Sequence, residues 1–194
     1  MQNNLYITKA LDVTTWPDFE RLVEKHNGVW GGCWCMSFHS EGATKSTTYE
    51  QNHQRKAQRV QEGRAHAALV YAGEVAVGWC QFGPTDELPH IKHRREYAAG
   101  LTDLPDWRIT CFFVDLEYRK KGVASAALAG ALTQIAALGG GIVESYPEDV
   151  NGRKVSSTFI HNATLGLFEQ YGFERVRQLG KNNWVVRKFV KPIP

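Results

Sequence analysis

The stretch CFFVDLEYRKKGVASAAL, from Cys111 to Leu128, decides the fold of this chain. It begins with apolar residues typical of a buried strand, passes through a short basic segment, and continues into alanine-rich sequence typical of a helix. The first N–H groups of a helix lack partners within the helix, and the helix dipole favours negative charge beside them. The basic segment RKKGVA, residues 119–124, therefore predicts an anion site where a strand gives way to a helix.

Two better-known phosphate loops do not fit this chain. A Walker loop needs GxxxxGK[ST] and a dinucleotide loop needs GxGxxG after a strand, and neither pattern occurs. The three glycines at 139–141 lie after the predicted helix, at the wrong end for phosphate binding, and are better interpreted as a helix C-cap. A charged turn in an unrelated α/β domain is the alternative for residues 119–124.

The rest of the chain predicts a single mixed α/β domain over residues 1–194. Patterns typical of strands occur at 5–11, in a hairpin over 65–84 that turns at 72–74, at 107–115, at 139–147, and in a closing hairpin at 173–179 and 183–190. Patterns typical of helices occur at 14–28, 47–63, about 121–138 and 156–172. The long polar connection at 85–106 is expected to hold a short helix or a lid over a site.

Composition excludes several classes of protein. The 194 residues are 43% hydrophobic, enough for one continuous core, and the net charge of +3 argues against nucleic acid as the main partner. The densest basic run, residues 92–95, is short and favours a solvated face. No stretch of about 18 apolar residues occurs and the N-terminus lacks an apolar run, so we expect a soluble cytoplasmic protein without membrane association.

The cysteines are expected to be reduced thiols in that compartment. Cys33, Cys35 and His39 lie in one aromatic loop, but C-x-C is not the usual zinc spacing and no second cysteine pair follows. We therefore expect no metal, and a zinc-dependent interaction protein is the less favoured alternative.

The segment RKKGVA matches the pattern [QR]-x-x-G-x-[GA], and this part of the chain resembles the acyl-coenzyme A loop of the GCN5-related N-acetyltransferase (GNAT) family. FFVDLEYR resembles the family's strand ending, and LGLFEQYGFERV resembles its later helix and closing GF. The resemblance covers about residues 65–190, and the strand-helix-helix opening extends it to the N-terminus. It implies the GNAT fold, a central, mostly antiparallel sheet flanked by helices, with acetyl-CoA as co-substrate.

The resemblance also assigns a cofactor site. It implies that Phe113 and Val114 expose backbone groups to the pantetheine arm, and that the Val114 amide is the donor for the thioester oxyanion. The pyrophosphate would be bound by N–H groups of the following loop, with Arg119 at its entrance: Lys120, Lys121, Gly122, Val123, Ala124 and Ser125. His161 or Asn162 would contact coenzyme A from the start of the last predicted helix, unless the residue only caps that helix.

Acetyl transfer to an amine needs a base for the ammonium and gains from an acid for the departing thiolate. The resemblance makes Glu144, on the predicted fifth strand, the first candidate base, and Asp115 is the second; a structural ion pair or turn is the alternative for each. Phe168 stands where the family usually has a tyrosine acid. That role is therefore left to Tyr171, Tyr146, Tyr118 or solvent.

In the family resembled here, the loop after the first helix forms a wall of the acceptor pocket. The aromatic residues expected at that wall predict an apolar or flat acceptor: Trp30, Trp34, Phe38, Trp79, Phe82 and Tyr146. Packing of the same rings into the core is an equal alternative.

We therefore expect an acetyl-CoA-dependent N-acetyltransferase that acts on a small-molecule amine by direct attack in a ternary complex, as a monomer or homodimer. The alternative is a non-catalytic acyl-CoA-binding sensor, which Phe168 makes plausible.

Overall fold

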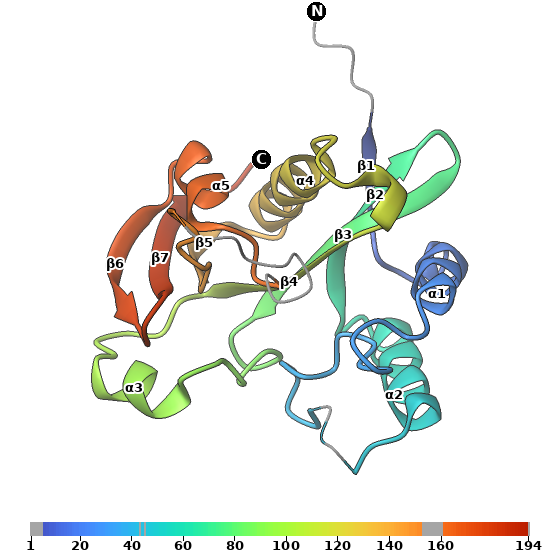
Figure 1. The fold of residues 1–194 in the computed structure, drawn as a ribbon, viewed down its shortest axis with the longest axis horizontal. Coiled ribbons are helices and arrows are strands. Elements are labelled where there is room, and N and C mark those ends of the chain that lie inside the picture. Colours follow the sequence, from blue (N-terminus) through green and yellow to red (C-terminus); the bar gives the residue numbers. More distant parts are fainter. Residues whose placement is uncertain (1–5, 43, 45, 153–160, 194) are drawn as a thin grey trace, which may run out of the picture.

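The computed structural model describes residues 6–42, 44, 46–152 and 161–193 of the chain. Seven strands of this described part form one sheet in the order β1-β2-β3-β4-β5-β7-β6 (Figure 1). The strands are β1 (Ile7–Ala10), β2 (His66–Ala72), β3 (Val75–Pro84), β4 (Trp107–Val114), β5 (Gly141–Ser145), β6 (Glu174–Leu179) and β7 (Asn183–Val190). The helices are α1 (Trp16–Lys25), α2 (Tyr49–Gln61), α3 (Arg94–Ala99), α4 (Val123–Ala137) and α5 (Leu165–Gln170), with a 3-10 turn, η1 (Leu116–Tyr118).

The sheet is antiparallel except where β4 meets β5. These two strands run parallel and pair over residues 107–109 and 143–145. Beyond Ile109, β4 continues to pair with β3 alone, after a register shift opposite Gln81 and Phe82. The sheet therefore opens at its centre, as Figure 1 shows between β4 and β5. The prediction of a mostly antiparallel sheet flanked by helices is confirmed.

Helices cover both faces of the sheet. In β2, Ala68 and Val70 belong to the core cluster beneath α4 and α5, whereas Leu69 and Tyr71 belong to the cluster beneath α1 and α2. Successive strand residues point to opposite faces, so one apolar strand supplies both layers.

Small residues bring α4 close to the sheet. A Cβ atom added to Gly130 would lie 2.8 Å from the side chain of Thr8 on β1. Ala127, about one turn before Gly130, and Ala131, the residue after it, are fully buried. The small residues of this sequence therefore let α4 pack closely against the sheet.

The last helix is shorter than predicted. It was expected over 156–172, but α5 begins at Leu165, and residues 161–164 form turns and a bridge. Ala163 has a left-handed backbone with φ of 57°, which a continuous helix does not allow. The expected residues 156–160 lie outside the described part of the chain. The short helix expected between 85 and 106 is α3.

None of the described helices has the length and apolarity needed to cross a bilayer.

Candidate active site: two cavities on either side of β4

The open edge of β4 presents backbone N–H groups to the gap. The Asp115 N–H donates to a carbonyl of β3, at 2.9 Å, whereas the Phe112 N–H donates to the His161 carbonyl, at 2.7 Å, on the opposite side. Every second residue of a strand directs its backbone groups to the same side. The Val114 N–H therefore faces the gap, as the sequence led us to expect.

The expectation for the Phe113 backbone was wrong by one residue. Its carbonyl lies against β3, where a Cβ atom on Gly78 would be 2.6 Å from the carbonyl oxygen. The backbone groups that face the gap are those of Phe112 and Val114. Phe113 still contributes its ring, which stacks on Trp79 with centroids 4.7 Å apart and lines the cleft described next.

A cleft of about 640 Å³ lies between the open edge of β4 and the first turns of α4 and α5. We call it the α4 cleft. Its lining residues are Trp30, Phe112, Phe113, Val114, Tyr118, Arg119, Lys120, Gly122, Val123, Ala124, Ser125, Ala163, Thr164, Gly166, Leu167 and Gln170. The loop predicted from RKKGVA thus lies opposite the exposed edge of β4.

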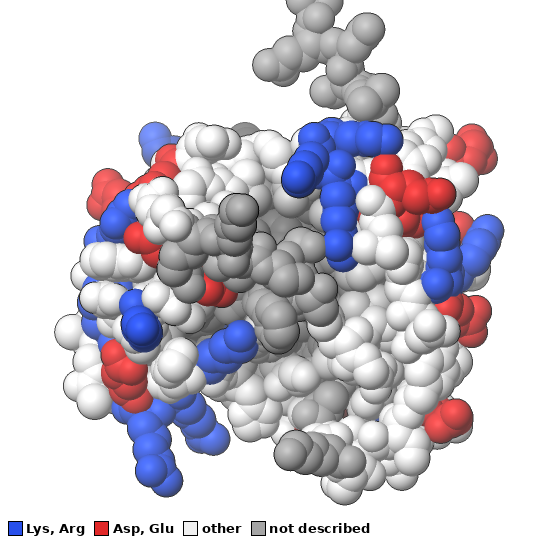
Figure 2. Space-filling model, viewed as in Figure 1, with Lys and Arg blue, Asp and Glu red and all other residues white. Residues whose placement is uncertain are grey.

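The loop before α4 has the form of an anion cradle. Lys120 and Gly122 have left-handed backbones, with φ of 59° and 85°, and Gly122 is the N-cap of α4. No atom lies within 4 Å of where a Cβ on Gly122 would be, so the backbone there is open to a ligand. Figure 2 shows Lys and Arg side chains gathered over this end of the molecule, beside a hollow.

Lys121 is the exception among the predicted loop residues. Its ammonium lies 5.5 Å from the centroid of the Tyr118 ring, and Lys121 does not line the α4 cleft. Of the predicted cations, Arg119 and Lys120 line the cleft.

The Tyr171 side chain bonds to the first turn of α4. Its hydroxyl donates to the Ser125 carbonyl at 2.9 Å and lies 2.7 Å from the Ser125 Oγ. The position of the family's tyrosine, Phe168, is fully buried against Phe112 and Phe173. Tyr171 is therefore placed to hold α4 against α5, at the phosphate end of the cleft, rather than to protonate a thiolate near Val114.

Asn162 also supports the backbone rather than the cleft. It is buried in the turn before α5, and its Nδ2 donates to the Tyr146 carbonyl at 3.3 Å. The expected contact with coenzyme A therefore does not follow from its position. Its neighbours Ala163 and Thr164 line the cleft.

A second cavity, of about 570 Å³, lies on the other side of the same strand. We call it the cysteine cavity. It is lined by Trp30, Cys33, Cys35, Ser37, Phe38, His90, Ile91, Lys92, Cys111, Glu148 and His161. Trp30 lines both cavities, and Cys111 precedes the β4 residues that line the α4 cleft. The two cavities therefore adjoin where β4 leaves β5.

Glu148 was not among the predicted site residues. Its N–H donates to the Ala163 carbonyl at 3.2 Å, and its own carbonyl accepts from the Leu165 N–H at 2.9 Å. The start of α5 thus fixes the backbone of Glu148 at the cysteine cavity. The available signal was a second carboxylate just after Pro147, which ends the strand.

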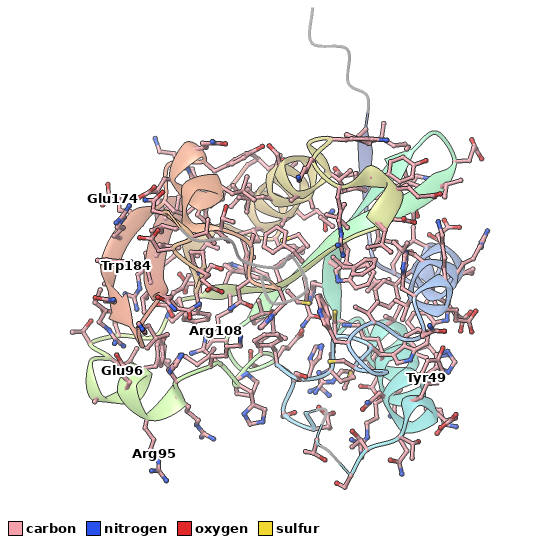
Figure 3. The ribbon with its side chains drawn as sticks, viewed as in Figure 1. Tyr49, Arg95, Glu96, Arg108, Glu174 and Trp184 are labelled. Atoms are coloured by element: carbon pink, nitrogen blue, oxygen red, sulfur yellow. The ribbon has the colours of Figure 1, made fainter. Side chains whose placement is uncertain are left out.

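Glu144 is a structural carboxylate, and its assignment as base was wrong. It is fully buried and lines neither cavity. One oxygen accepts from the Tyr97 and Tyr146 hydroxyls, each at 2.6 Å, and the other accepts from Arg187 Nε at 2.7 Å. Arg108, labelled in Figure 3 between β4 and α3, adds a guanidinium 3.4 Å from the Tyr97 hydroxyl.

Glu144→Gln is expected to lower the free energy of unfolding by about 3 kcal/mol, because one partner of a buried ion pair is removed. Chemical denaturation of the folded protein measures this loss. Exposed Glu174→Gln, on β6, is the matched control and is expected to change stability by less than about 0.5 kcal/mol. A Glu144→Gln protein of wild-type stability that has lost its turnover would contradict the structural role.

Asp115 is likewise structural. Its carboxylate accepts from Lys25 Nζ at 2.8 Å and from the Glu117 N–H at 3.1 Å, and His26 Nε2 lies 3.4 Å away. Burial alone would raise the pKa of Asp115, but the bonds from these three residues lower it below its usual value. A carboxylate held in its charged form by α1 is a poor candidate for a base, and the second base assignment is corrected as well.

Most of the predicted acceptor aromatics belong to the core. Four of the six are almost fully buried: Trp34, Trp79, Phe82 and Tyr146. Trp34 packs between Trp16 and Tyr49, with centroids 6.0 and 5.4 Å away. Trp30 and Phe38 line the cysteine cavity. Core packing, the alternative interpretation, therefore applies to most of this set.

Among the described residues, no group of three or more His, Cys, Asp or Glu side chains is arranged to hold a metal ion. Cys33 Sγ lies 3.0 Å from the Ser37 hydroxyl, and His39 Nδ1 lies 3.1 Å from the Glu87 carbonyl. The two residues are thus engaged with different partners.

The fold has well-matched relatives among solved structures, at low sequence identity. An N-acetyltransferase from Staphylococcus aureus Mu50 superposes with a TM-score of 0.56, at 12% identity, over 96% of this chain and 99% of that one. NAA60 from Arabidopsis thaliana, solved in complex with acetyl-CoA, gives 0.51 at 13% identity over 95% and 99% of the two chains. The ribosomal-protein-S18-alanine N-acetyltransferase from Escherichia coli gives 0.50 at 11% identity over 97% and 96%.

No curated protein sequence matches this chain significantly. The sequence pattern of the Acetyltransferase (GNAT) family matches residues 19–152, which contain β4, the basic loop and α4. This match covers well over half of the chain, and the solved structures share its fold over nearly their whole length. The chain belongs to the GNAT acetyltransferase family.

Proposed function

We propose that this chain transfers an acetyl group from acetyl-CoA, bound in the α4 cleft, to the amine of a small molecule bound in the cysteine cavity. The observation that carries this proposal is the junction of the two cavities at β4, where Trp30 lines both. A thioester at this junction and an amine in the next cavity can react directly in one ternary complex.

The α4 cleft offers a suitable environment for each of two parts of acetyl-CoA, the pyrophosphate and the pantetheine arm. The pyrophosphate would lie at the start of α4, where Gly122 leaves the backbone open and Arg119 and Lys120 add positive charge. The pantetheine arm would lie along the open edge of β4. When bound, acetyl-CoA supplies the activated thioester, and every other part of the proposed chemistry is assigned to the protein.

The Val114 N–H is the proposed oxyanion donor. It faces the gap, on the same side as the Phe112 N–H, which the His161 carbonyl already engages. A fixed dipole at the place where negative charge develops stabilises the transition state without reorganisation.

Glu148 is the proposed base. It is the carboxylate among the described residues that line the cysteine cavity, and its backbone is fixed by α5. It would accept a proton from the ammonium form of the acceptor before attack. Phe168 offers no proton, so the leaving thiolate would take one from water entering the open cleft.

The proposed acceptor is a small, partly flat amine. A volume of about 570 Å³ is in the range of pockets that bind small ligands. Trp30, Phe38 and Ile91 provide apolar walls, and Glu148 provides a negative charge for an ammonium group.

Thiol release from acetyl-CoA in the presence of a panel of small aromatic and aliphatic amines tests the proposal. We expect release that depends on the amine, with an acetylated product in the mass spectrum. Binding of acetyl-CoA in calorimetry without release for any amine would instead support the sensor, the alternative that the buried Phe168 favours.

A further inference from the structure

Two cysteines from distant parts of the chain meet at the floor of the cysteine cavity. Cys35 follows α1 in a loop and Cys111 lies in β4, and their sulfur atoms are 3.2 Å apart. Both line the cavity, although only 1% and 2% of their surfaces are exposed. Both residues therefore border the space that a small reagent would enter.

A buried lysine lies beside this pair. Lys56 on α2 is 1% exposed, and its ammonium lies 3.2 Å from Gln81 Oε1 and 3.4 Å from His39 Nε2. Neither Gln81 nor His39 carries a negative charge. Burial, together with the charges of Lys56 and Arg59, lowers the pKa of His39 to about 2. Arg59 has its own carboxylate partner in Glu41.

The thiols are the acidic groups that favour the charged form of Lys56. Burial lowers the pKa of Lys56, and the nearby Cys35, Cys111 and Cys33 oppose that change. Burial alone would raise the pKa of Cys35, but the hydrogen bond from Cys111 and the charge of Lys56 lower it. The pKa of Cys111 is raised by burial and by Cys35. The lowered pKa of Cys35 and the raised pKa of Cys111 make Cys35 the better candidate for the attacking sulfur.

The backbone at Cys35 supports a functional role. Trp34 and Cys35 have left-handed conformations, with φ of 50° and 53°. Such conformations are costly for residues other than glycine, and they gather at functional sites. The core packing of Trp34 holds this turn, which places the Cys35 sulfur against β4.

We propose that Cys35 and Cys111 are a redox-active dithiol, which a hydroperoxide oxidises to a disulfide across the floor of the cysteine cavity. The Cys35 sulfur attacks the peroxide as its thiolate, the O–O bond breaks, and Cys35 becomes a sulfenic acid while the other oxygen leaves as hydroxide or alkoxide and takes a proton from solvent. Cys111 then attacks the Cys35 sulfur, the S–O bond breaks, and water leaves with the Cys111 proton. Two thiols lose two electrons, which reduce the peroxide.

The consequence for turnover rests on the proposed function. A disulfide brings the sulfur atoms to about 2.05 Å, so the loop that carries Cys35 must approach β4. This alters the acceptor cavity, whereas the loop before α4, which would bind the pyrophosphate, lies outside that cavity. Oxidation is therefore expected to lower kcat/KM for the amine at least about tenfold, to preserve acetyl-CoA affinity, and to be reversed by dithiothreitol.

Peptide mapping of the full chain after treatment with hydrogen peroxide tests the dithiol itself, independently of any acetyl transfer. We expect a peptide that links Cys35 to Cys111, in wild type and in Cys33→Ser, and no such link in Cys35→Ser or Cys111→Ser. Cys33 is the matched control because it lines the same cavity and burial raises the pKa of its thiol. Lys56→Met is expected to slow oxidation about tenfold, since less thiolate is present.

The decisive result comes from the wild-type protein, so it does not depend on whether a variant folds. A link between Cys33 and Cys35, or oxidation without any link, would overturn the assignment of the pair. If the link forms and no amine is a substrate, the dithiol stands and the proposed function fails.

Discussion

Glu148→Gln is expected to lower kcat by a factor of about 10² to 10⁴ and to leave the affinity for acetyl-CoA within about twofold. The amide has the same shape as the carboxylate but cannot accept the proton of the acceptor. Glu148 lines the cysteine cavity and not the α4 cleft. Its substitution should therefore affect the reaction of the acceptor amine and not the binding of acetyl-CoA. Steady-state kinetics with the acceptor amine measure the effect.

Asp149→Asn is the matched control for this variant. The neighbouring carboxylate lines neither cavity, and its Oδ1 accepts from the Asn151 N–H at 3.0 Å. Its removal is expected to leave kcat unchanged. A Glu148→Gln enzyme with wild-type kcat would contradict the assignment, and a comparable loss of kcat in His161→Gln alone would move the role to that residue.

Gly122→Glu is expected to weaken acetyl-CoA binding at least about a hundredfold. Gly122 has φ of 85° and no atom within 4 Å of a Cβ position, so the new side chain both strains the N-cap and brings negative charge to the cradle. A charge placed against the pyrophosphate at the positive end of α4 removes the attraction that the site depends on. Calorimetric titration with acetyl-CoA measures the loss.

Gly63→Glu separates strain from charge. Gly63 follows α2, has φ of 67°, and also has no atom within 4 Å of a Cβ position. It shares the conformation of Gly122 but does not line either cavity. Equal loss of acetyl-CoA affinity in both variants would trace the effect to general destabilisation and contradict the assignment of the loop.

Local patterns sufficed to predict most of the fold. The turn at residues 72–74 and the apolar runs beside it predicted the β2–β3 hairpin, because alternation and turn chemistry are both local. The alanine-rich segment predicted α4 to within two residues. The last helix was predicted to include residues 161–164, but these residues form turns and a bridge, and the His161 carbonyl accepts from the Phe112 N–H of β4.

Backbone direction could not be predicted in the same way. Whether Phe112 or Phe113 faces the gap depends on the register of β4 against β3, which shifts opposite Gln81 and Phe82. A one-residue change in register turns every backbone group to the other side. The position of the loop before α4, in contrast, follows from the helix start alone, and all of its predicted residues except Lys121 line the α4 cleft.

Contacts between residues that are distant in the sequence explain why the predicted catalytic bases were wrong. Glu144 and Glu148 lie four residues apart and look alike in the sequence, but Arg187, on β7, neutralises the first. Asp115 is similarly engaged by Lys25, 90 residues earlier in the chain. No local pattern in the sequence identifies Arg187 or Lys25 as these partners. None predicts that Cys35 lies against Cys111 either.

Amide hydrogen exchange with and without acetyl-CoA tests the central claim most directly. We predict slower exchange at the Val114 N–H, on the open edge of β4, and at the first turn of α4, residues 123–125, because the ligand would cover these groups. The first turn of α2 is a helix start outside both cavities and should not change. Protection of other segments, with unchanged exchange at Val114 and residues 123–125, would contradict acetyl-CoA binding in the α4 cleft.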